Sequence, residues 1–139
     1  MIKNLSAILS LCIMAALVLA ILSNTYPTLI KEEKYPLDIT SGSFSGINVD
    51  TDKIHFGVIV PGGMSERTLA ISNTASYKTK AVFDCEGEIC PFVFLEKNNA
   101  VLSSNENKNV TMLAKLPAGT EMNKTFEGNL TVRVYKRLF

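Results

Sequence analysis

The sequence contains no tryptophan and carries a formal net charge of only +1, and each shortage argues against a class of function. Aromatic residues make up 8% of the chain, so there is little material for a platform that stacks bases or sugars. Because Lys3 is the one charged residue before position 24, residues 24–139 carry thirteen basic and thirteen acidic side chains. A neutral segment of this kind has no electrostatic footprint for nucleic acid, and we expect no nucleic-acid partner.

Motifs that carry catalysis are also missing. The single histidine, His55, would need a nucleophile within reach to act as a general base, and no motif nominates one. His55 alternates with Ile54 and Phe56, which predicts that it faces solvent. Pro61-Gly62-Gly63 lacks the lysine and the following helix of a phosphate-binding loop, so we expect a turn between two strands. We predict no catalytic residue, no cofactor and no metal site.

The N-terminal segment is a long apolar run. Leu5–Leu22 contains no charge and two serines, and its length approaches the ~20 residues that cross a bilayer as a helix. It is longer than the roughly 7–15 residues usual in the core of a cleaved signal. We predict a signal-anchor helix over residues 1–23 that contacts the lipid bilayer, with cleavage after Ala20 or Ser23 as the alternative. Lys3 favours a cytoplasmic N-terminus and an extracytoplasmic C-terminal domain.

Residues 24–46 are expected to form a linker. They contain two prolines, two glycines and many serines and threonines, which interrupt regular structure. The simplest interpretation is a loose tether between the helix and the domain. In an alternative interpretation, Tyr35–Thr40 pairs as a strand with the edge of a sheet, in its own chain or in a neighbour's.

From residue 47 onwards, apolar residues recur at every second position, which is typical of β-strands. The predicted inward faces are Ile54, Phe56, Val58 and Val60; Leu69 and Ile71; Ala81, Phe83 and Cys85; Val110, Met112 and Ala114; and Leu130, Val132 and Val134. Turn residues separate these runs, and no segment after Leu22 shows a helical repeat. About seven short strands over ~90 residues indicate an all-β domain, an Ig-like β-sandwich over residues 47–139.

A family resemblance agrees with this fold. Phe56-Gly57, the Pro61-Gly62-Gly63 turn and Leu69–Asn73 resemble the start of the Ig-like modules of the major-sperm-protein and ASPM/SPD-2/Hydin type. The later Asn-rich turn, Pro117, and Gly128 before the last strand are similar to the same modules. Versions of these modules occur in exported archaeal and bacterial surface proteins. The resemblance implies a non-catalytic adhesion or scaffold module and carries no catalytic residues.

Cys85 and Cys90 are the two cysteines outside the apolar run. In an exported domain such a pair indicates a disulfide, and Gly87 between them permits the necessary turn. Free thiols, a redox pair and a metal site are the alternatives. The spacing is not the C-x-x-C of redox motifs, and a structural zinc takes four Cys or His ligands.

Three Asn-x-Ser/Thr sequons, at Asn109, Asn123 and Asn129, fall in the last third of the chain. They are glycosylation candidates in an exported domain, and Asn129 points outward by alternation. A fourth sequon, at Asn4, precedes the apolar run and is expected on the other side of the membrane.

These patterns together predict a membrane-anchored extracytoplasmic module with a non-catalytic binding or structural role at the cell envelope. We expect a single-pass protein of the cell membrane whose partner is another envelope protein; secretion after signal cleavage is the alternative. The alternative function is a subunit of an extracellular filament, assembled through the N-terminal helix or by strand exchange. An enzyme is disfavoured because triads, paired carboxylates and metal ligands are absent from the sequence.

Overall fold

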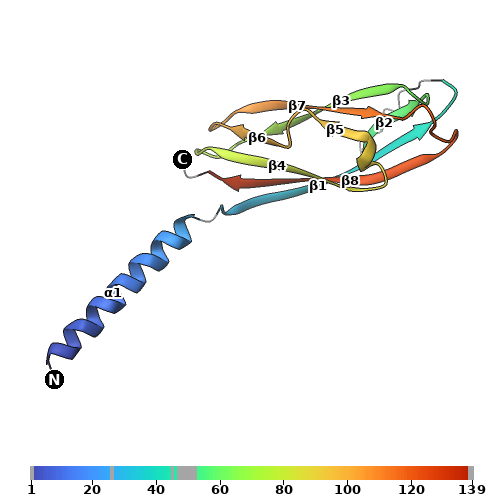
Figure 1. Cartoon of the computed structure of the whole chain (residues 1–139). Coiled ribbons are helices and arrows are strands. Elements are labelled where there is room, and N and C mark those ends of the chain that lie inside the picture. Colours follow the sequence, from blue (N-terminus) through green and yellow to red (C-terminus); the bar gives the residue numbers. More distant parts are fainter. Residues whose placement is uncertain (1, 26, 45, 47–52, 138–139) are drawn as a thin grey trace.

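The structure, a computed structural model, describes residues 2–25, 27–44, 46 and 53–137 and consists of one helix followed by a two-layered β domain (Figure 1). The elements are α1 (Ile2–Thr25), β1 (Leu29–Ser41), β2 (Ile54–Ile59), β3 (Met64–Ser72), β4 (Thr79–Gly87), the short 3-10 helix η1 (Cys90–Phe92), β5 (Val93–Leu95), β6 (Asn99–Leu102), β7 (Asn107–Lys115) and β8 (Thr125–Lys136). One sheet has the strand order β2-β1-β8-β4-β6 and the other β3-β7-β5. The prediction of an all-β, two-sheet domain is confirmed.

Helix α1 projects away from the sandwich (Figure 1). The side chains described in it, those of residues 8–21, are all exposed, with Leu11 at 68% and Leu19 at 67%. Within the part of the chain that the structure describes, no helix is long and apolar enough to cross a membrane. The structure therefore does not support the predicted transmembrane helix.

The predicted linker is wrong over Leu29–Ser41, which form strand β1. This strand lies inside the five-stranded sheet, antiparallel to β8 along almost its whole length and parallel to β2 at its C-terminal end. The pairing with its own chain is the alternative that the sequence left open for Tyr35–Thr40. Leu37 and Ile39 are 1% and 0% exposed, so β1 fills the core and the β domain begins near Leu29.

The predicted alternation holds in the central strands. The buried members of the predicted inward faces of β4, β7 and β8 are Ala81, Phe83, Val110, Met112, Ala114, Leu130 and Val132. Cys85, Val134, Leu69 and Ile71 are partly buried against the same core. Because both sheets turn such a face inward, the core lies between them, as a sandwich requires.

In β2 the alternation changes at Gly57, and the predicted inward set is wrong for its last two members. Phe56 and Ile59 are both 1% exposed, whereas Val58 is half-buried and Val60 is exposed. The register with β1 shifts at this point, and Gly57 has a φ of 81°. One extra residue in β2 forms a β-bulge, which reverses the face that each later residue occupies.

The predicted turn at Pro61-Gly62-Gly63 is confirmed. It connects β2 in one sheet to β3 in the other, and Gly62 has a φ of 85°, which few residues other than glycine adopt. The Gly63 N–H donates a hydrogen bond to the carbonyl of Val60 at 2.7 Å. The turn also joins the end of β7, because the Gly62 N–H donates to the carbonyl of Leu116 at 2.9 Å.

Candidate functional site

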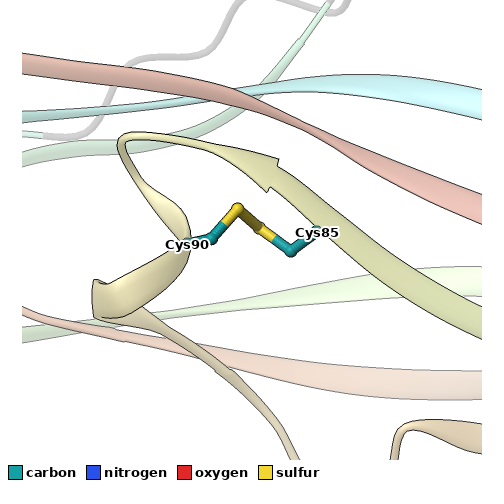
Figure 2. Close-up of a disulfide and its surroundings, with 2 residues drawn as sticks. All are labelled: Cys85 and Cys90. Carbon is teal, nitrogen blue, oxygen red and sulfur yellow. A yellow bond between two sulfur atoms is a disulfide. The ribbon is translucent and has the colours of Figure 1, made fainter.

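The two cysteines of the β domain are joined. Figure 2 shows the disulfide that links Cys85, on β4, to Cys90, at the start of η1, with an S–S distance of 2.03 Å and a Cα–Cα distance of 5.6 Å. The predicted pairing is confirmed. In this state neither sulfur is a thiol or a metal ligand, so the pair links β4 to the turn that follows it.

A pair of glycines brings this disulfide loop close to β8. Gly87 of β4 is the register partner of Gly128 of β8. A Cβ atom on Gly128 would lie 2.5 Å from the carbonyl oxygen of Glu86 and 2.6 Å from Cγ2 of Ile89. Ile89 itself is fully buried, and its N–H donates to the carbonyl of Glu127 at 3.2 Å. The loop is therefore packed on the sheet, and the disulfide closes a structured segment.

Replacing Cys85 is expected to destabilise the domain and leave its fold intact. For Cys85→Ser we expect a loss of about 2 kcal/mol of unfolding free energy, because the cross-link between residues five apart restricts the unfolded chain. The melting temperature should fall by roughly 10 °C. Differential scanning calorimetry of detergent-solubilised full chain measures this. The matched control is Cys12→Ser, which removes the free exposed cysteine of α1 and should leave the transition unchanged; equal melting of both variants would contradict a stabilising role.

An acid–imidazole pair joins β1 to β2, and the sequence did not reveal it. Nδ1 of His55 lies 2.7 Å from Oδ1 of Asp38, and the two side chains are 7% and 20% exposed. His55 does alternate with Phe56, but the prediction that it faces solvent is wrong, because it packs beside Asp38, its register partner. Asp38 belongs to the segment predicted as a linker, so its position beside β2 was not predicted.

Side chains of β3 hold the backbone of β2 at the same point. Arg67 Nε donates to the carbonyl of His55 at 2.6 Å, and the Ser65 hydroxyl donates to the carbonyl of Phe56 at 2.9 Å. Arg67 Nη1 also donates to Ser65 Oγ at 3.3 Å. The serine proton is thus given to a backbone carbonyl, and not to His55. This arrangement ties β2 of one sheet to β3 of the other and presents no activated nucleophile.

Charged side chains of the five-stranded sheet form exposed ion pairs. Arg133 of β8 contacts Glu32 of β1, with Nε 2.9 Å from Oε2, and also pairs with Asp84 of β4. The hydrogen bond to Glu32 raises the pKa of Arg133, so the cation is maintained. The hydrogen bond from Lys31, 2.6 Å away, lowers the pKa of Glu33. These pairs are solvent-exposed, and such pairs add little to stability.

The described residues offer limited places for a ligand. Among them, no group of three His, Cys, Asp or Glu side chains is arranged to hold a metal ion. An open cavity of about 440 Å³ lies beside β4 and β5, lined by Phe83, Asp84, Cys85, Val93, Phe94, Leu95 and Asn98. Its carboxylate, Asp84, already pairs with Arg133, and Phe94 is 54% exposed at its rim.

The asparagines of the three sequons are exposed, whereas Thr131 of the Asn129 sequon is buried. Asn109 is in β7 and Asn129 is in β8, whereas Asn123 lies in the loop between these strands with a φ of 59°. The backbone N–H of Asn123 donates to the carbonyl of Ser41 at 2.9 Å, and Asn123 itself is exposed. All three asparagines stay glycosylation candidates.

Comparisons with models of known protein families, with curated proteins and with solved structures return no match. The resemblance to Ig-like modules therefore stays a prediction, and the function is argued from the geometry of this chain.

Proposed function

We propose that the chain is an extracytoplasmic module with a non-catalytic binding or structural role, held at the cell envelope by α1. The observation that carries this proposal is the combination of an exposed apolar helix with a disulfide-bonded β domain. Disulfides persist in oxidising compartments outside the cytoplasm, so the cross-link favours export.

The apolar surface of α1 supports a lipid partner. The described side chains of residues 8–21 include Leu9, Leu11 and Leu19 at 64–68% exposure, and the β domain does not cover them. Apolar surface on this scale is unfavourable in water and marks a contact with a membrane or another protein. The proposal needs α1 to contact lipid; it does not need the helix to span the bilayer.

The side chains of the β domain support a role without catalysis. Cys85 and Cys90 are bonded to each other, His55 is held by Asp38, and the Ser65 hydroxyl is bonded to a backbone carbonyl. These four side chains are thus engaged in holding the fold. What the domain offers a partner is surface, and we propose another envelope protein as that partner.

Membrane fractionation followed by intact mass tests the proposal. We expect the full chain in the membrane fraction, resistant to a high-salt wash and released by detergent, with a mass two hydrogens lower before reduction than after. A chain lacking residues 1–28 is the matched control and should be recovered in the aqueous fraction. Full chain that is washed from membranes by salt, or that carries reduced Cys85 and Cys90, would contradict the proposal. Protein in the medium whose mass corresponds to a chain starting after Ala20 or Ser23 would instead establish a cleaved signal.

A further inference from the structure

We propose that β1 is exchanged between copies of this chain, so that the β1 strand of one copy completes the five-stranded sheet of another. The partner is a second copy of the same chain. This inference goes beyond the envelope role proposed above, and it does not depend on whether α1 contacts lipid.

The first half of β1 is held on one side. Strand β8 pairs with β1 from Leu29, opposite Tyr135, to Thr40, but β2 begins to pair with it only at Leu37. In the described chain, Leu29–Pro36 therefore has one strand partner instead of two. Leu29 and Ile30 are 48% and 44% exposed. Separating β1 can begin at this end, where few contacts are broken at each step.

The connection from β1 to β2 is long enough to permit the exchange. The two strands are adjacent and parallel, and residues 42–53 join them. Parallel neighbours need a crossover of about a dozen residues or more, so this connection is near the lower limit. Two of its described residues contact β2: the Gly42 N–H donates to the carbonyl of Ile59, and Gly46 exchanges two hydrogen bonds with Val58. Fully extended, the same residues reach about 40 Å, enough to carry β1 into a neighbouring sheet.

The site that β1 leaves is specific for another β1. Leu37 and Ile39 point into the core, while Asp38 between them points the other way and meets His55 at 2.7 Å. A slip of one residue would turn Asp38 into the core and both apolar side chains outward. A strand that fills this site must therefore have apolar side chains on either side of a carboxylate, as β1 of a second copy does.

Pairing of copies along their free edges is disfavoured by charge. The exposed edge of β1 carries Lys31, Glu32, Glu33 and Lys34. In an antiparallel pair of copies centred on this run, lysine would face lysine and glutamate would face glutamate. Like charges directly opposite each other destabilise a strand pair, and charged edges prevent edge-to-edge association. Exchange avoids this contact because β8 and β2 remain the partners of β1. A reciprocal exchange closes a dimer, and a one-way exchange extends a chain of copies.

Two chains that each carry one cysteine outside the Cys85–Cys90 disulfide test the exchange. Thr40 on β1 and Thr125 on β8 have their hydroxyl oxygens 3.1 Å apart, so cysteines at these positions can be cross-linked. Full-length Thr40→Cys and Thr125→Cys chains of different tag mass, both carrying Cys12→Ser, are refolded together in detergent and treated with a short thiol cross-linker. We expect a cross-linked product containing one chain of each kind, and its yield should rise with protein concentration.

The matched control uses Thr68→Cys and Thr111→Cys chains in the same background. Thr68 and Thr111 are register partners in β3 and β7, which stay within one chain in the proposed exchange. Association through α1 alone would cross-link both mixtures equally. A chain carrying both Thr40→Cys and Thr125→Cys should cross-link in every case, which verifies that the two positions are adjacent in the folded protein. If that chain cross-links within itself and the mixed Thr40→Cys and Thr125→Cys chains give no more product than the control mixture, the proposal is overturned.

Discussion

Deleting residues 1–41 is expected to abolish folding of the β domain, whereas deleting residues 1–28 is expected to leave it folded. The longer deletion removes β1, and with it Leu37 and Ile39 from the core. Losing a buried leucine or isoleucine side chain costs about 2–5 kcal/mol, and a domain has about 5–15 kcal/mol in total. The deletion also takes away the antiparallel partner of β8. Two such side chains and a central strand together exceed the stability available.

Far-UV circular dichroism and amide dispersion in two-dimensional NMR distinguish the two deletions. The chain lacking residues 1–28 should unfold cooperatively, and the chain lacking residues 1–41 should show no transition. Adding a peptide of residues 29–41 should restore the transition, and a peptide with Leu37→Asp and Ile39→Asp should not. Equal melting of the two deleted chains would mean that β1 is a tether after all.

The second large effect is expected at Gly128, where an added methyl group has no space. We expect Gly128→Ala to lower the unfolding free energy by about 3 kcal/mol, at the upper end of the usual cost of overpacking. The new Cβ would lie 2.5 Å from the Glu86 carbonyl oxygen and 2.6 Å from Ile89. Neither neighbour moves easily, because Glu86 is in a strand and Ile89, within the disulfide loop, is fully buried.

Urea unfolding of the detergent-solubilised full chain measures this difference. Gly119→Ala is the matched control, because a Cβ at Gly119 meets no atom within 4 Å. Its unfolding free energy should stay within about 0.5 kcal/mol of the natural chain, as for surface substitutions generally. An equal result for the two alanine variants would show that β4 and β8 do not approach as closely as the structure has them.

Local patterns predicted the strands whose apolar residues alternate without interruption. Strand β7, with Val110, Met112 and Ala114 inward, is one example. Alternation did not predict strand β1. Pro36 and the charged run before it leave only Leu37 and Ile39 as aliphatic residues at the strand period. The bulge in β2 was not predicted for a different reason. A bulge is defined by the pairing with a partner strand, and that partner, β1, was expected to be a linker.

In the candidate site, too, features set by the local sequence could be predicted, and features set by strand register could not. The Cys85–Cys90 bond joins residues five apart, so their spacing and the intervening glycine were sufficient to predict it. The Asp38–His55 contact joins residues seventeen apart on two neighbouring strands, and it depends on register. No local pattern contains that register. The reversal of His55 from a surface residue to a buried one therefore follows directly from the missed strand.

The antiparallel pairing of β1 with β8 also determines how the domain responds to mechanical load. Leu29 lies opposite Tyr135, so the helix and the C-terminal end meet at the same end of the sandwich (Figure 1). Tension between these two ends would peel β1 from β8 one hydrogen bond at a time. Tension between α1 and a partner bound at the opposite end would instead run parallel to β1. The hydrogen bonds, which lie perpendicular to the strands, would then resist as a group, so a partner at that far end would load the module in its strongest direction.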